Sequence, residues 1–184
     1  MSSEVLLRRG QAALLVIDVQ ERLAAVMEER HTVVQAIATL IKGCQQLGVP
    51  VLYAEQYPKG LGPTVLELRE LLLPAEPLTK LYFSCCKGTD LLSRLKERQV
   101  TQVVVVGMEA HICVLQTALD LLAEGFAVHV VSEGVTSRKL LDKQVALARL
   151  HARGAQVTTV EAVLFELVER SDAAEFRAIR SLIR

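Results

Sequence analysis

The chain has 184 residues, of which 51% are hydrophobic, and its 21 Lys and Arg residues balance 21 Asp and Glu residues. This length and apolar content suit one domain with a full core. The basic residues are not clustered with aromatic residues, so we expect no nucleic-acid partner. Apolar stretches fall short of the roughly 18 residues that span a bilayer, so we expect no membrane partner either.

Residues 1–10 are polar and include Arg8 and Arg9, and they lack the apolar core of a secretory signal. The four cysteines have irregular spacing, which fits neither a disulfide framework nor a paired metal site. They are Cys44, Cys85, Cys86 and Cys113. We therefore expect a cytoplasmic protein whose thiols are free.

Short apolar runs alternate with longer amphipathic stretches, a pattern typical of parallel βαβ units. The expected strands, in chain order, are residues 12–17, 49–54, 78–82, 103–106, 127–131 and 156–160. The expected helices are residues 31–47, 63–72, 87–98, 112–124, 140–152, 161–168 and 173–184. We predict an α/β fold: a single-domain, three-layer α/β/α sandwich with a mainly parallel, about six-stranded Rossmann-like sheet.

The last helix, at about residues 173–184, is expected to be an accessory packing or interface element. Its apolar side chains form one stripe, which must cover either the sheet edge or another subunit. They are Phe176, Ile179, Leu182 and Ile183. We therefore predict a homo-oligomer, either a dimer or a larger assembly.

Asp18, Lys80 and Cys113 each lie at or just past the end of a predicted strand. Ligands of open α/β sheets bind outside the carboxyl ends of the strands, so we expect these three side chains to converge. The motifs leave simpler roles open for each residue. Asp18 could cap a turn, Cys113 could be a packing residue and Lys80 could lie on the surface.

Cys113 follows a strand and a tight loop, and we expect it at the start of a helix. The positive end of a helix lowers the pKa of a thiol, and free N–H groups there can bind an oxyanion. Of the four histidines, His111 in this loop is the one we place near the chemistry. No histidine has a partner at metal-ligand spacing, which predicts no metal.

A turn-rich loop follows the second predicted strand at the same edge, and we expect it to form a pocket wall or lid. Aromatic rings concentrate around it, which suits a small planar or apolar substrate. The predicted pocket residues are Gln20, Leu23, Tyr53, Gln56, Tyr57, Tyr82, Phe83 and His111.

The segments around Asp18, Lys80 and Cys113, taken together and in this order, resemble the isochorismatase-like hydrolase superfamily in its cysteine-hydrolase branch. The resemblance covers nearly the whole chain. The loop that begins at Glu55 further resembles the subgroup called isochorismatase domain-containing protein 2. The branch includes nicotinamidases and N-carbamoylsarcosine amidase.

The resemblance implies a catalytic triad in which Asp18 takes the thiol proton, Lys80 orients Asp18 and Cys113 attacks a carbonyl carbon. It also implies a cis peptide between Met108 and Glu109, and an oxyanion hole formed by the backbone amides of Glu109 and Cys113. No cofactor is implied.

Two segments differ from the nicotinamidase pattern. Nicotinamidases have an Asp-x-His-Pro segment that helps to bind a metal ion, whereas this chain has Tyr57 at the histidine position. The residues before the nucleophile are Ala110 and His111, where those amidases usually have Thr-Asp. We therefore predict no catalytic metal and a substrate other than nicotinamide.

The preferred hypothesis is a metal-independent cysteine hydrolase that cleaves a C–N bond of a small amide-like substrate through a thioester. One alternative is an ester or vinyl-ether hydrolase that uses Asp18 and Lys80. A second alternative is a non-catalytic protein on the same scaffold, which binds a small molecule or supports assembly.

Overall fold

The computed structural model describes residues 6–183. Its centre is a six-stranded parallel sheet with the order β3-β2-β1-β4-β5-β6. The strands are β1 (Ala12–Ile17), β2 (Val51–Gln56), β3 (Leu78–Lys80), β4 (Gln102–Met108), β5 (Ala127–Thr136) and β6 (Gln156–Thr158). The α/β prediction is confirmed, and the sheet is entirely parallel. The strand order changes direction between β1 and β4, where α/β folds place their ligands.

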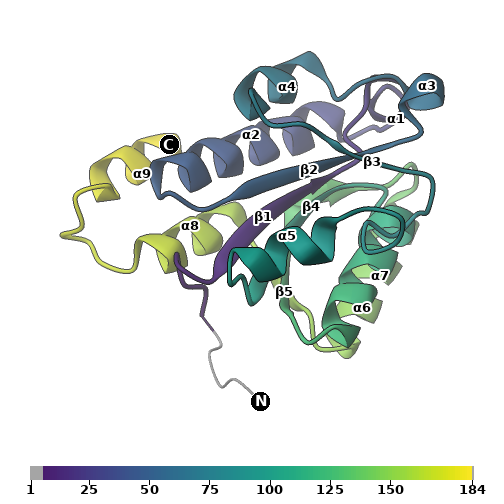
Figure 1. Ribbon diagram of the computed structural model, residues 1–184. Coiled ribbons are helices and arrows are strands. Elements are labelled where there is room, and N and C mark those ends of the chain that lie inside the picture. The colour runs from purple at the N-terminus through teal and green to yellow at the C-terminus, as the bar shows by residue number, and fades with distance from the viewer. Residues whose placement is uncertain (1–5, 184) are drawn as a thin grey trace.

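Helices cover both faces of the sheet, which gives the three predicted layers (Figure 1). One face is covered by α2 (Arg30–Gln46), α4 (Leu66–Leu72), α8 (Val160–Val168) and α9 (Phe176–Leu182). The other is covered by α5 (Leu91–Glu97), α6 (Leu115–Ala123) and α7 (Leu140–Ala152). Two short helices follow β1 and β2: α1 (Glu21–Ala24) and α3 (Pro58–Leu61). None of the described helices is long and apolar enough to span a membrane.

The alternation of side chains along β1 divides the interior into two cores. Leu14 and Val16 point into the core beneath α2, which we call the α2 core. Leu15 and Ile17 point into the core beneath α5 and α6, which we call the α6 core. All six residues of β1 are buried because helices pack on both faces of a parallel sheet.

The structure corrects several element boundaries. β5 continues five residues beyond the predicted end at Val131 and reaches Thr136. The predicted helix at residues 112–124 is two elements, a π-helical turn η1 (Ala110–Val114) followed by α6. α3 falls within the segment that we predicted to be a turn-rich loop.

The last helix, α9, is shorter than predicted, and its apolar stripe packs within its own chain. Ile179 is fully buried in the α2 core, and Phe176 and Leu182 pack against that core. α9 contacts α2 and α8. The stripe on α9 is therefore partly covered in the single chain, with Ile179 buried and its other members half-buried.

Candidate functional site

Asp18 directly follows β1, at the carboxyl edge of the sheet. Its backbone has a positive φ of 53°, a left-handed conformation that Asp and Asn adopt more readily than most residues. The backbone N–H of Asp18 donates to the carbonyl of Ala54, which continues the pairing with β2. The left-handed turn ends β1 and leaves the buried carboxylate at the strand end.

Gly107 in β4 allows this edge to be closely packed. It pairs with Ile17 in the sheet, and its φ is 128°. A Cβ atom at this position would lie 2.0 Å from the carbonyl oxygen of Ile17. Only glycine therefore fits where β4 approaches the last residue before Asp18.

Lys80 and Asp18 form a buried ion pair. Lys80 ends β3, and its Nζ donates to Asp18 Oδ2 at 2.7 Å, with both side chains fully buried. The same Nζ donates to Gln56 Oε1, also at 2.7 Å. Asp18 Oδ1 is buried and has no partner at hydrogen-bond geometry among residues 6–183. One oxygen of the carboxylate is thus held by Lys80, while the other is unpaired.

The Cys113 thiol lies in η1, close enough to Asp18 that each group affects the pKa of the other. Burial raises the pKa of Cys113 above its usual range, and the negative charge of Asp18 raises it further. Burial also raises the pKa of Asp18, against the opposing effect of Lys80. Burial and the neighbouring anion thus raise the pKa of Cys113, contrary to the expectation that a helix start lowers it.

The Met108–Glu109 peptide at the start of this turn is cis, as the family resemblance implied. The carbonyl of Glu109 accepts hydrogen bonds from the N–H groups of Ile112 and Val114, the two neighbours of Cys113. Glu109 thereby fixes the residues on either side of the thiol.

Four of the predicted pocket residues lie beside Lys80. Gln56 contacts the Lys80 ammonium, and its Nε2 donates to the carbonyl of Leu81. Gln20 binds the backbone of Gln56 through both its amide oxygen and its amide nitrogen. The N–H of Tyr57 donates to the carbonyl of Lys80, while its side chain is exposed. Tyr82 follows closely along the chain and is also exposed.

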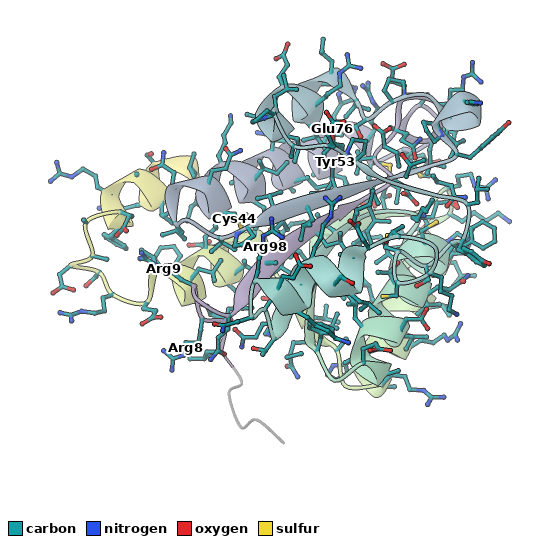
Figure 2. All side chains as sticks on the ribbon, in the orientation of Figure 1. Arg8, Arg9, Cys44, Tyr53, Glu76 and Arg98 are labelled. Carbon is teal, nitrogen blue, oxygen red and sulfur yellow. The ribbon has the colours of Figure 1, made fainter. Side chains whose placement is uncertain are left out.

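The other predicted pocket residues are placed differently. Tyr53 points into the α2 core, and its hydroxyl donates to the carbonyl of Ala75 (Figure 2). Leu23 packs against the same core. Phe83 is exposed, three residues after Lys80. His111 lies within η1, and its Nδ1 is 2.9 Å from Ser137 Oγ. Tyr53 therefore points away from the face on which the Cys113 turn packs, and the role of Leu23 in a pocket remains a prediction.

Three residues that were not predicted from the sequence pattern contact Glu109 or the turn that holds Cys113, namely Ser137, Arg138 and Asp142. Arg138 Nε donates to Glu109 Oε1 at 2.6 Å. His111 Nε2 is 3.8 Å from Asp142 Oδ2. The signal was available in principle, because polar residues after a parallel strand lie at the carboxyl edge. It was missed because β5 was predicted to end at Val131.

Comparisons with known proteins identify the family. The isochorismatase domain model matches residues 12–162. Isochorismatase domain-containing protein 2 of Bos taurus is 40% identical over 176 residues, which cover 95% of this chain and 84% of the relative. The chain belongs to the isochorismatase family. A further relative, isochorismatase domain-containing protein 1 of Salmo salar, is 37% identical over 91% of this chain, which spans 59% of that relative's length.

Solved structures share the isochorismatase fold. The MAR1 ribonuclease of Caenorhabditis elegans has a TM-score of 0.90 and 37% identity, covering 97% of this chain and 92% of that chain. The YcaC protein of Escherichia coli, described as an octameric hydrolase of unknown specificity, has a TM-score of 0.90 at 23% identity, with 99% and 92% coverage. A nicotinamidase of Staphylococcus aureus has a TM-score of 0.76 and 25% identity, with 82% and 99% coverage.

The residues at the metal-binding segment of nicotinamidases do not fit a metal ion in this member of the isochorismatase family. Glu55 Oε1 accepts hydrogen bonds from both the N–H and the hydroxyl of Thr64. Gln56 Oε1 is bound by the Lys80 ammonium, and Tyr57 lies where the family resemblance places a histidine. Within residues 6–183, no three His, Cys, Asp or Glu side chains are grouped for metal binding.

Proposed function

We propose that this isochorismatase-family hydrolase is a metal-independent cysteine hydrolase that cleaves a C–N bond of a small amide-like substrate. The observation that supports it most is the buried Lys80–Asp18 pair at the carboxyl edge, with one carboxylate oxygen unpaired and Cys113 beside it. A buried carboxylate oxygen without a partner costs free energy, and a catalytic role is one explanation for retaining it.

The raised pKa of Cys113 means that the resting thiol is neutral. Asp18, whose own pKa is raised, takes the thiol proton as Cys113 Sγ attacks the carbonyl carbon. The backbone amides of Glu109 and Cys113 stabilise the oxyanion. The C–N bond then breaks, and Asp18 passes the proton to the departing nitrogen, which leaves a thioester on Cys113.

A water molecule completes the cycle. Asp18 removes a proton from this water as its oxygen attacks the thioester carbonyl, and the proton returns to the departing sulfur. The products are a carboxylic acid, an amine or ammonia, and the free thiol. Lys80, paired with Asp18, offsets the changing charge of that carboxylate.

The test is turnover of a panel of small primary amides and N-carbamoyl compounds by the wild type and Cys113→Ala. We expect Cys113→Ala to lose turnover by at least about 10³-fold. The thioester adduct should appear by intact mass only when Cys113 is present. Cys44→Ala is the matched control, because Cys44 is buried in the α2 core and should be dispensable for turnover.

The same panel tests the alternatives. An ester or vinyl ether that is hydrolysed equally well by Cys113→Ala would favour chemistry by Asp18 and Lys80 alone. An RNA oligonucleotide belongs in the panel because the Caenorhabditis elegans relative is called a ribonuclease. Absence of turnover and of any adduct across the panel would favour the non-catalytic binding protein.

Self-association also remains a prediction, although the stripe on α9 no longer supports it. Exposed apolar side chains follow β3, namely Leu81, Tyr82 and Phe83, and offer a different contact surface. Sedimentation at micromolar concentration would detect the oligomer, and a monomer there would contradict it.

A further inference from the structure

Glu109 is a buried carboxylate whose hydrogen-bonding partner is an exposed cation. Glu109 is 3% exposed, and it directly precedes the η1 turn that holds Cys113. The Arg138 side chain is 59% exposed, yet its Nε lies 2.6 Å from Glu109 Oε1. The hydrogen bond also raises the pKa of Arg138. Arg138 therefore provides the charge that the buried carboxylate requires.

His111 connects the same carboxylate to α7. Its Nε2 is 3.9 Å from Glu109 Oε2 and 3.8 Å from Asp142 Oδ2, and its Nδ1 is 2.9 Å from Ser137 Oγ. We call the five residues Glu109, His111, Ser137, Arg138 and Asp142 the Glu109 cluster. The cluster joins the Cys113 turn, the segment after β5 and the first turn of α7.

Glu109 transmits this anchoring to Cys113 through its backbone. Its side chain is held by Arg138, and its carbonyl accepts hydrogen bonds from Ile112 at 3.1 Å and Val114 at 3.2 Å. These two residues flank Cys113, so a shift of Glu109 displaces the thiol and the adjacent amides. A small displacement of a reacting group is expected to reduce the rate strongly.

We propose that Arg138 is a positioning residue that holds the Cys113 turn through Glu109, and that His111 replaces it as the cation when Arg138 is removed. The expected effect of Arg138 on turnover rests on the proposed function. Its effect on the geometry of the Cys113 turn does not depend on that function. Exposed ion pairs usually contribute little. This pair differs because loss of Arg138 leaves a buried carboxylate without its hydrogen-bond donor.

The charges around His111 make the replacement dependent on pH. Glu109 and Asp142 are the carboxylates that face it, Arg138 is the neighbouring cation, and Ser137 is neutral. An imidazole is positively charged only at acidic pH. Without Arg138, the turn should therefore keep its native geometry better at acidic than at alkaline pH.

The experiment measures the rate of Cys113 modification by iodoacetamide between about pH 6 and 9, a range in which imidazoles titrate. Peptide mass spectrometry follows the wild type, Arg138→Met, Arg138→Lys and the double variant Arg138→Met with His111→Asn. We expect Arg138→Met to show an additional transition of about fivefold in rate, consistent with ordinary coupling energies. The double variant should lack this transition, and Arg138→Lys should keep the wild-type profile.

Two further variants make the test specific. Arg170→Met is the matched control, because Arg170 pairs with Asp172 where both side chains are exposed, and its profile should match the wild type. Glu109→Gln removes the negative charge that pairs with Arg138. Adding Arg138→Met to Glu109→Gln should therefore change the profile no further, a comparison that holds even if either single variant is less stable.

An Arg138→Met profile that matches the wild type at every pH would overturn the proposal. A transition that persists without His111 would overturn the assigned role of His111. With a substrate in hand, Arg138→Met should lower kcat while KM stays nearly constant. Full turnover by Cys113→Ala would refute the proposed function and leave the iodoacetamide result intact, so the two failures are distinguishable.

Discussion

Cys44 and Cys113 are buried thiols on opposite faces of the sheet. Burial raises the pKa of Cys44 to about 12, and burial is also the largest cause of the raised pKa of Cys113. Cys44 lies in the α2 core between α2 and the sheet (Figure 2), whereas Cys113 faces the Asp18–Lys80 pair. The two thiols therefore resist ionisation alike and differ in having a base within reach. At this site we expect reactivity to depend on proton transfer rather than on a stable thiolate.

The largest expected effect comes from Asp18→Asn, which separates the need for a base near Cys113 from the raised pKa of its thiol. Asp18→Asn removes the base, so turnover should fall by about 10³-fold or more. The same change removes the anion that raises the pKa of Cys113. Alkylation of Cys113 should therefore move to lower pH while catalysis disappears. Discontinuous activity assays measure the loss of turnover. Alkylation rates across pH measure the shift in the reactivity of Cys113.

Cys44 provides the internal reference for this prediction. Its pKa has burial as its cause, so its alkylation profile in the folded protein should be the same in the wild type and Asp18→Asn. Equal shifts of both thiols would indicate general loosening of the fold. Turnover that survives Asp18→Asn would exclude Asp18 as the general base.

Lys80→Met tests the buried Asp18–Lys80 ion pair, which lies beside Cys113 and has no counterpart among the groups that affect the pKa of Cys44. It leaves the buried Asp18 without its cation, so the free energy of unfolding should fall by about 3–5 kcal/mol. Adding Asp18→Asn should recover part of this loss, because no buried charge then remains. Urea denaturation measures both changes. Lys96→Met, which breaks an exposed pair with Glu124, should cost less than about 1 kcal/mol, and an equal loss there would contradict the argument.

Gly107→Ala tests the close approach of β4 to β1. The added Cβ would meet the Ile17 carbonyl at 2.0 Å, and the φ of 128° is unsuitable for alanine. We expect a loss of about 3 kcal/mol or more, measured by thermal or urea unfolding. Gly10→Ala is the control, because nothing lies within 4 Å of its Cβ position and it should be nearly neutral.

The smallest effect concerns stability at high pH. The pKa of Cys44 is about 12 in the folded chain and ordinary when unfolded, so its contribution is complete below pH 9 and is lost as pH rises toward 12. At pH 10 the loss for one such thiol should be about 1.5–2 kcal/mol. Cys44→Ala should make the unfolding free energy less dependent on pH in this range, and an unchanged slope would contradict the assignment.

The sequence was sufficient for the fold and for the expectation that Asp18, Lys80 and Cys113 lie at one edge of the sheet. β1 and α7 have the predicted bounds, because a continuous apolar run and a helical period are strong local signals. Asp18, Lys80 and Cys113 were found because charged or reactive side chains directly follow or interrupt apolar runs. Strand ends at one edge of a parallel sheet then meet, which needs no detailed geometry.

Other features depend on contacts that a local pattern does not contain. Tyr53 and Gln56 are three residues apart in β2, so they point to opposite faces, and only Gln56 reaches Lys80. The pKa of Cys113 was expected to be lowered, because the burial that raises it cannot be read from the local sequence pattern. Arg138 was missed because an interruption by Ser132 and Glu133 concealed the second half of β5.

The Asp18–Lys80 pair joins residues 62 positions apart in the chain. The pairing of β1, which Asp18 follows, with β4 joins Ala12 to Gln102. Contacts of such long sequence separation form late and slowly in folding because large loops must close first. During synthesis, the proposed catalytic site therefore cannot form until most of the chain has been made. Nascent or truncated chains that end before β4 hold a carboxylate and a lysine but no completed site, so activity would report the folding of the whole sheet.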